Sequence, residues 1–289
     1  MHFQLRWVAA LIAIVASVSA PARGLDVYRI GNSLTWDSQP PAIAKIAEQR
    51  GHEHVVGWHI KCGSPLISIR QNPEVVCVKP PMGTYLEALS KRKWDVVTIQ
   101  YHPGKDSTLA TDVACVLHFI EEARKHPDNR DTVFYLYSAW PARDLGDYAT
   151  VWQRDIADDE ATPTAHARQY AAHLLKRVRA ATDAKVRVIP AGEVLFRLHE
   201  KMKAGKAPGY DNVHQLYRDR VHLTHELGRY VAGVTVFSTL YNENPAGLTK
   251  PVGTYRKAGK DWPLPEPLAK LIHETVWEVV SGDSASSGE

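Results

Sequence analysis

The sequence predicts an α/β protein with a parallel β-sheet that carries helices on both faces. Short runs of β-branched and aromatic residues alternate with windows of helical periodicity from residue 25 to about residue 240. This alternation is typical of strands joined through helices by right-handed crossovers. The 289 residues are 44% hydrophobic and 23% charged, a composition that excludes a disordered, collagen-like or coiled-coil chain.

Five strands and four helices are expected in this region. The second helix shows the clearest signal, because Leu109, Val113 and Val116 recur at i, i+4 and i+7 and form one apolar stripe. Thr224 is expected to cap the last helix. The expected strands are Leu25–Ile30, His54–Ile60, Asp95–Gln100, Thr132–Tyr137 and Val186–Pro190, and the expected helices are Ala42–Arg50, Thr108–His126, Thr164–Thr182 and Glu226–Tyr241.

The N-terminus has the composition of a secretory signal peptide. Arg6 supplies a positive charge, Trp7–Val18 is apolar or small throughout, and Ala20–Ala22 offers small residues for cleavage. The apolar run is too short to span a bilayer comfortably, so we expect no stable membrane insertion. Residues 1–22 are therefore expected to be removed and the mature protein to be secreted or periplasmic, with an uncleaved N-terminus as the alternative.

The mature chain is expected to form one domain with an extension. Residues 23–245 would form the α/β domain, and residues 246–289 an extension packed on it through a helix over Leu268–Val280. Gly282–Glu289 is rich in Ser and Gly and is expected to be a frayed tail. Residues 138–162 are expected to be a long polar connection, either functional or disordered.

Export allows the cysteines to pair. Cys62 and Cys77 lie in one loop-rich stretch, whereas Cys115 lies in a helical pattern. A bridge between Cys62 and Cys77 is the favoured pairing, and three free thiols remain the alternative. The chain contains no C-x-x-C, so neither a redox motif nor a zinc ribbon is indicated.

The charge balance argues against a polyanionic partner. Lys and Arg number 35 against 32 Asp and Glu, which gives a formal charge of +3. No basic run interleaved with aromatic residues occurs, so we do not expect nucleic-acid binding. The sequence gives no indication of an oligomeric state.

Polar residues follow the expected strands. In an open parallel sheet, ligands bind beyond the carboxyl ends of the strands, so the segments after these strands should meet at one edge. Together they contain the groups that acyl transfer requires. The relevant segments are Gly31–Thr35, Lys61–Ser64, Gln100–Gly104 and, further downstream, Asp219–Thr224.

A serine needs a base to become a nucleophile. Ser33 is the candidate nucleophile, His222 is a suitable base because the ordinary pKa of histidine lies near neutrality, and Asp219 can orient the imidazole. The developing oxyanion then needs donors, for which the candidates are the backbone N–H groups of Ser33 and Gly63 and the side-chain amide of Gln100.

These segments resemble a known family. G-N-S-L after the first strand, a glycine after the second and D-x-x-H near the C-terminus are similar to blocks I, II and V of the SGNH/GDSL hydrolase superfamily. The phrase D-R-V-H-L-T-H-E-L-G-R-Y is similar to a segment of exported bacterial SGNH-like proteins. The resemblance implies a flavodoxin-like three-layer α/β/α fold with a five-stranded parallel sheet. It also implies Ser33, Asp219 and His222 as a catalytic triad, Gly63 as an oxyanion donor and no cofactor.

Two positions depart from the superfamily pattern. Asn32 replaces the usual aspartate of block I, a structural position outside the triad. No G-x-N-D follows the third strand to supply the block III asparagine. Some sugar-acetyl esterases of the superfamily use a glutamine there, which would be Gln100. His102 or a rearranged oxyanion hole remains the alternative.

Loop aromatics favour a carbohydrate ester as substrate, because aromatic faces stack on sugar rings. We expect a serine esterase that removes small acyl groups, above all acetyl, with Trp36, Tyr101, His102 and Trp140 in contact with a small-molecule or glycan ester. Three alternatives remain open. They are a non-catalytic carbohydrate-binding or surface protein of this fold, a lipase or acyl-thioesterase of this fold, and a metallohydrolase that uses Asp219, His222 and His225.

Overall fold

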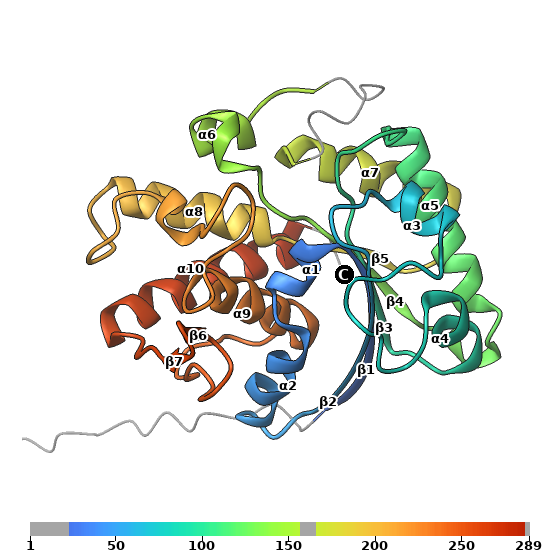
Figure 1. Ribbon diagram of the computed structural model, residues 1–289, viewed down its shortest axis with the longest axis horizontal. Helices are drawn as coiled ribbons and strands as arrows, with labels where there is room; N and C mark the ends of the chain where they lie inside the picture. Colours follow the sequence, from blue (N-terminus) through green and yellow to red (C-terminus); the bar gives the residue numbers. More distant parts are fainter. Residues whose placement is uncertain (1–22, 157–165, 287–289) are drawn as a thin grey trace, which may run out of the picture.

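A five-stranded, all-parallel sheet forms the centre of the molecule (Figure 1). The computed structural model describes residues 23–156 and 166–286, so the expected signal peptide lies outside the described residues. The strand order is β2-β1-β3-β4-β5, which is the flavodoxin order. The strands are β1 (Gly24–Gly31), β2 (Glu53–Ile60), β3 (Val96–Ile99), β4 (Val133–Tyr137) and β5 (Val186–Ile189).

Helices cover both faces of this sheet and make the fold a three-layer α/β/α structure (Figure 1). One layer contains α1 (Ser33–Asp37), α2 (Pro40–Glu48), α6 (Tyr148–Trp152), α8 (Ala191–Lys203), α9 (Gly228–Tyr241) and α10 (Glu266–Ser286). The other contains α3 (Leu66–Gln71), α4 (Tyr85–Lys91), α5 (Leu109–Arg124) and α7 (Arg168–Ala181). The expected fold class is therefore confirmed.

Strand β1 shows how the two cores form. Leu25 and Val27 pack into the core beneath α2 and α9, whereas Tyr28 and Ile30 pack into the core beneath α4 and α5. Successive side chains of a strand point to opposite faces, and both faces are covered here. The strand is consequently buried along most of its length, which fixes the position of its carboxyl end.

Three sequence expectations differ from the structure. Helix α9 begins at Gly228 rather than Glu226, because residues 225–227 form a turn, although the Thr224 hydroxyl still accepts a hydrogen bond from the Gly228 N–H at 2.9 Å. The connection after β4 contains the 3-10 helix η2 (Arg143–Leu145) and α6, so its first part is ordered, while residues 157–165 lie outside the described ones. Helix α10 continues to Ser286, into the expected tail.

The C-terminal extension shares the core of the α/β layers. Helix α10 packs against α9 and α8 and buries Leu268, Ile272 and Val276 with them. Before it lie the short strands β6 (Arg256–Lys257) and β7 (Lys260–Asp261), which form a two-stranded hairpin. Within residues 23–156 and 166–286, no helix combines the length and apolar character needed to cross a membrane.

Candidate active site

The candidate nucleophile lies on a tight turn at the carboxyl end of β1. Asn32 separates the strand from α1, and its side chain accepts a hydrogen bond from the Leu34 N–H at 2.9 Å, which caps the helix. Ser33 is the first residue of α1. Gly31 precedes this turn, where a Cβ atom would lie 2.2 Å from Thr35 Oγ1 and 2.8 Å from Gln100 Oε1, so only glycine fits without displacing them.

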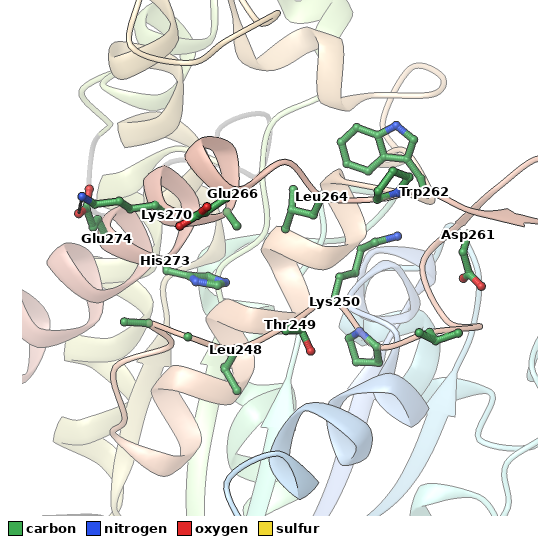
Figure 2. A pocket seen from close by; sticks show the side chains of 16 residues that line it. Leu248, Thr249, Lys250, Asp261, Trp262, Leu264, Glu266, Lys270, His273 and Glu274 are labelled. Carbon is green, nitrogen blue, oxygen red and sulfur yellow. Dashed lines mark ion pairs between the residues drawn. The ribbon is translucent and has the colours of Figure 1, made fainter. Parts of the chain in front are cut away.

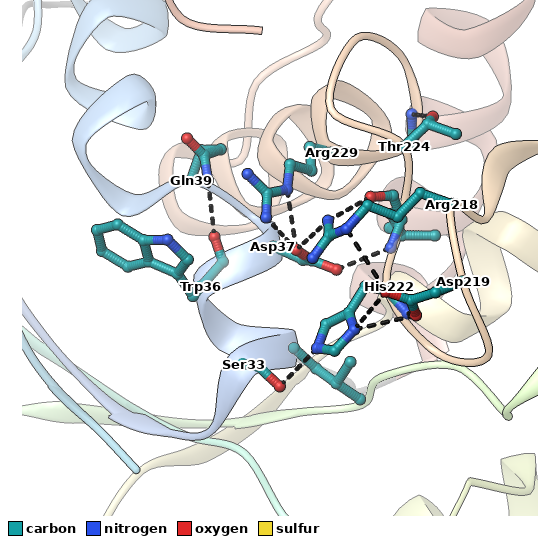
Figure 3. A network of polar contacts seen from close by, with 12 residues as sticks. Ser33, Trp36, Asp37, Gln39, Arg218, Asp219, His222, Thr224 and Arg229 are labelled. Carbon is teal, nitrogen blue, oxygen red and sulfur yellow. Dashed lines mark hydrogen bonds and ion pairs between the residues drawn. The ribbon is translucent and has the colours of Figure 1, made fainter. Parts of the chain in front are cut away.

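The structure brings Ser33, His222 and Asp219 together, as the sequence predicts (Figure 3). His222 Nε2 lies 2.9 Å from Ser33 Oγ, and His222 Nδ1 lies 3.0 Å from both carboxylate oxygens of Asp219. These distances are within hydrogen-bond reach at each step of a serine–histidine–aspartate arrangement. The loop that carries His222 and Asp219 lies between the 3-10 helix η4 (Val213–Leu216) and α9.

Asp219 is held as a carboxylate. Partial burial alone raises its pKa, but hydrogen bonds from the backbone N–H groups of His222 and Val221 and from the imidazole outweigh burial and lower the pKa to about 2. The two backbone bonds measure 2.8 Å and 3.0 Å. Asp219 therefore remains charged at neutral pH, where it can stabilise an imidazolium on His222.

The loop after β2 lies against the Ser33 turn. The Asn32 side-chain amide donates to the backbone carbonyl of Ser64 at 3.2 Å, which joins the two segments. Gly63, with a positive φ of 65°, is exposed on this loop. A disulfide joins Cys62 to Cys77, the pairing that the sequence favours, and Cys115 is buried and unpaired.

Gln100 does not have the orientation expected of an oxyanion donor. Its Oε1 accepts hydrogen bonds from the Asn32 N–H and the Thr35 hydroxyl, both at 3.0 Å, and its Nε2 donates to the backbone carbonyl of Tyr101 at 2.9 Å. The side chain is 1% exposed. The expectation that Gln100 donates to the oxyanion is wrong, because its side-chain amide is bonded to the backbone and the hydroxyl of the turn that carries Ser33.

His102 lies in the loop after β3, near the imidazole of His222. Burial is the largest cause that lowers the pKa of His102 to about 4, and the charges of Arg220 and His222 lower it further. Its ring packs against His166 at 5.2 Å between centroids. His102 is therefore neutral at neutral pH and keeps one N–H to donate.

The aromatic residues expected to bind substrate divide into two groups. Tyr101 and Trp140 are 1% and 0% exposed, and their polar atoms bond to Ser138 Oγ and the Val221 carbonyl, so the expectation that they contact a ligand is wrong. Large aromatics next to loops pack into the cores here. Trp36 is partly exposed and meets Trp58 edge-on at 5.3 Å, which leaves this pair available at the site.

Sequence reasoning missed the residues that support the loop with His222. Asp37, at the end of α1, is fully buried and faces Arg218 and Arg229. The position of Asp37 in S-L-T-W-D could have indicated this role. The spacing puts this acid one helical turn beyond Ser33, with no basic residue near it in the sequence. Its partners lie in the D-x-x-H region, too far away in sequence for a local pattern to join them.

A metal cluster and a groove are the other features that could bind a ligand. The described residues contain no group of three or more His, Cys, Asp and Glu side chains placed to hold a metal ion. A groove of about 780 Å³ lies in the C-terminal extension between residues 246–252 and 261–274, and none of the three triad residues lines it (Figure 2). Its lining includes Leu248, Lys250 and Trp262 from the segments before α10, and His273 from α10 itself, all labelled in Figure 2.

Comparison with known proteins bears on the fold. No protein-family model matches the chain, and no curated protein matches it. Among solved structures, the chain is similar to a DUF4886 family protein from Bacteroides uniformis ATCC 8492, with a TM-score of 0.60 and 18% sequence identity. The match covers 89% of this chain and 95% of that chain. The chain therefore shares its three-layer α/β/α architecture with that protein.

Proposed function

We propose that this protein is an exported serine esterase of the SGNH type that removes small acyl groups, above all acetyl, from carbohydrates. The observation that carries the proposal is the chain of contacts from Ser33 Oγ through His222 to Asp219, at 2.9 Å and 3.0 Å. The three groups come from α1 and from a loop 186 or more residues further along the chain. A structural role alone does not require a serine, a histidine and an acid in this order.

The reaction follows from these contacts. Ser33 Oγ attacks the ester carbonyl while His222 Nε2 takes its proton, and Asp219 stabilises the imidazolium that forms. Collapse of the tetrahedral intermediate breaks the ester bond, and the imidazolium returns the proton to the departing alcohol. A water molecule, deprotonated by His222, then attacks the acyl-serine, releases the acid and restores the Ser33 hydroxyl.

The oxyanion would be stabilised by two backbone donors. The Ser33 N–H belongs to the first turn of α1, where the helix provides no internal acceptor, and the Gly63 loop is joined to this turn through Asn32 and Ser64. With Gln100 committed to the fold, neutral His102 is the candidate third donor from the β3 loop. Each donor of this kind contributes roughly 3 kcal/mol to the stability of a transition state.

The substrate class rests on the aromatic pair beside the nucleophile. Trp36 lies on α1, three residues from Ser33, and Trp58 lies on neighbouring β2 with its indole N–H bonded to the Lys79 carbonyl at 3.0 Å. Partly exposed indole faces suit the apolar face of a sugar ring. The disulfide supports export, because such bonds persist in oxidising compartments.

The test compares wild type with Ser33→Ala on p-nitrophenyl acetate and on an acetylated oligosaccharide. We expect wild type to release acetate from both, and Ser33→Ala to lower kcat by about 10⁴-fold or more. Ser90→Ala, at a serine of α4 whose hydroxyl donates to the Leu86 carbonyl of the same helix, serves as the matched control and should retain full activity. Equal rates for Ser33→Ala and wild type would exclude the triad.

A binding protein of the same fold is the second candidate. The observation that favours it is Gln100, whose amide is used inside the fold and leaves the oxyanion site with fewer donors. A wild type without esterase activity that still binds the acetylated oligosaccharide in calorimetry would favour this candidate. Loss of that binding in Trp36→Ala would then locate the binding surface.

A further inference from the structure

Asp37 is a buried carboxylate that connects the two halves of the candidate active site. It is the last residue of α1, the helix that begins with Ser33, and its side chain is 0% exposed. Figure 3 shows it between α1 and the loop that carries His222. A buried carboxylate is costly unless its oxygens are fully bonded, so its partners identify what the surrounding fold depends on.

All three partners of Asp37 come from the His222 loop or the helix after it. Oδ2 accepts a hydrogen bond from the Leu223 N–H at 2.8 Å, and Leu223 directly follows His222. Oδ1 accepts from Arg229 Nε at 2.9 Å and from Arg218 Nη1 at 3.3 Å. Arg218 directly precedes Asp219, so Asp37 holds the loop on both sides of the Asp219–His222 pair.

The loop itself lies near the surface. Asp219 and His222 have side chains that are 46% and 26% exposed. Bonds from the Arg218 N–H to the His222 carbonyl at 2.9 Å and from Arg218 Nη1 to the Leu223 carbonyl at 2.8 Å close the loop on itself. Such contacts fix its shape without fixing its distance from Ser33.

Other contacts tie the loop to a different part of the molecule. Trp140 Nε1 donates to the Val221 carbonyl at 2.7 Å, and the Arg143 N–H donates to the Arg220 carbonyl at 2.9 Å. Both donors belong to the connection after β4 rather than to α1. Among the described residues, the loop is joined to the nucleophile helix by the hydrogen bond between Ser33 and His222 and by the contacts of Asp37.

We propose that Asp37 is a positioning residue that sets the distance between Ser33 Oγ and His222 Nε2. It touches no reacting atom and acts through the Leu223 backbone and the Arg218 side chain. This role rests on the proposed function, because it concerns the geometry of that triad. Arg218 Nε also lies 3.6 Å from Asp219 Oδ2, so an Arg218 released from Asp37 would compete with His222 for that carboxylate.

The test is Asp37→Asn, which keeps the size of the side chain but turns an amide N–H₂ toward an arginine or the Leu223 N–H. We expect kcat on p-nitrophenyl acetate to fall about 100-fold with KM changed less than about threefold, since a displacement of about 1 Å in an active site has an effect of this size. Asp112→Asn is the matched control, because it removes a second buried carboxylate from the opposite helical layer, and its kcat should match wild type.

The outcomes separate this role from the proposed function. If Ser33→Ala is inactive while Asp37→Asn keeps wild-type kcat, the positioning role is overturned and the triad stands; if Ser33→Ala is fully active, the proposed function fails. An equal fall in Asp112→Asn would show that removing any buried carboxylate lowers kcat, and it would also overturn the role. If Asp37→Asn does not fold, Arg218→Met is the second variant, because it replaces a partly exposed side chain. The positioning role predicts that Arg218→Met lowers kcat about tenfold at unchanged KM. A wild-type kcat in Arg218→Met would overturn the role.

Discussion

Among the residues that the structure describes, each helical layer buries one aspartate, and the two carboxyl groups are compensated differently. Asp37, in the layer with the candidate active site, faces two arginines and one backbone N–H. Asp112, at the start of α5 in the opposite layer, accepts a hydrogen bond from the Tyr170 hydroxyl at 2.6 Å and lies 3.4 Å from Ser107 Oγ. Within residues 23–156 and 166–286, no arginine or lysine forms an ion pair with Asp112.

The difference shows two ways to bury a carboxyl group. Burial raises the pKa of Asp112 to about 7, although the hydrogen bonds from Tyr170 and Ser107 lower it in part. That group can lose its charge at modest cost. Asp37 instead pairs with two arginines, and these ion pairs join segments that are distant in sequence. Removing one arginine would lower the free energy of unfolding strongly, because a buried carboxylate would be left without a partner. The hydrogen bonds around Asp112 are compatible with a neutral carboxyl group. The ion pairs of Asp37 hold the segments of the candidate active site together.

The largest expected effect comes from removing an arginine from Asp37. Arg229→Met should lower the free energy of unfolding by about 4 kcal/mol, because it leaves a buried carboxylate short of a partner. Urea denaturation at pH 7 measures this. The matched control is Arg197→Met, whose side chain is 42% exposed and pairs with Glu193 and Glu200 at the surface, where a loss below about 1 kcal/mol is expected. Equal losses in the two variants would contradict the comparison.

The next effect is a pH dependence that belongs to Asp112. Its folded-state pKa of about 7 lies above the value of roughly 4 for an unfolded chain, so the folded state binds more protons between these values. The resulting stabilisation is complete below about pH 4 and is lost as the pH rises through 7. Asp112→Asn should therefore gain about 3.5 kcal/mol relative to wild type between pH 4 and pH 8 in urea denaturation. Parallel curves for the two proteins would show that Asp112 keeps an ordinary pKa.

The smallest effect tests the hydrogen bond that Asp112 receives. Tyr170→Phe should lower the free energy of unfolding by about 1 kcal/mol at pH 5, where the carboxyl is neutral, and by somewhat more at pH 8.5, where the acceptor is charged. Thermal unfolding at the two pH values measures the difference. A loss that is larger at pH 5 than at pH 8.5 would reverse the assigned protonation states.

The sequence predicted most parts of the fold that depend on local periodicity, although no helix was expected over the 13 residues of α8. All five strands and the long helices α5 and α9 were expected close to their observed bounds, because each shows several turns or strand residues of regular apolar spacing. The helices α1, α3 and α4 have 5, 6 and 7 residues, too few for such a stripe to develop. They were not predicted, although α1 carries the nucleophile.

The candidate site could be predicted as far as topology fixes it. Parallel strands deliver their carboxyl ends to one edge, so Ser33 and His222 could be placed together from motif order. Packing decides which way a side chain points, and motif order contains no information on it. The expected contacts of Gln100 with the oxyanion and of Trp140 with substrate were therefore wrong. Asp37 escaped notice because its bond to Leu223 spans 186 residues, and no local pattern records a charge pair at that separation.

The disulfide beside Gly63 makes the candidate oxyanion site dependent on the surrounding thiol chemistry. Both cysteines of the bridge are exposed, within reach of a reductant in solution, and they are 15 residues apart. Closing a segment of this length contributes about 3 kcal/mol by restricting the unfolded chain. Protein synthesised in a reducing cytoplasm would assemble Ser33, His222 and Asp219 without that covalent restraint on the neighbouring loop. The proposed esterase activity should therefore be higher after folding in an oxidising medium than after folding in a reducing one.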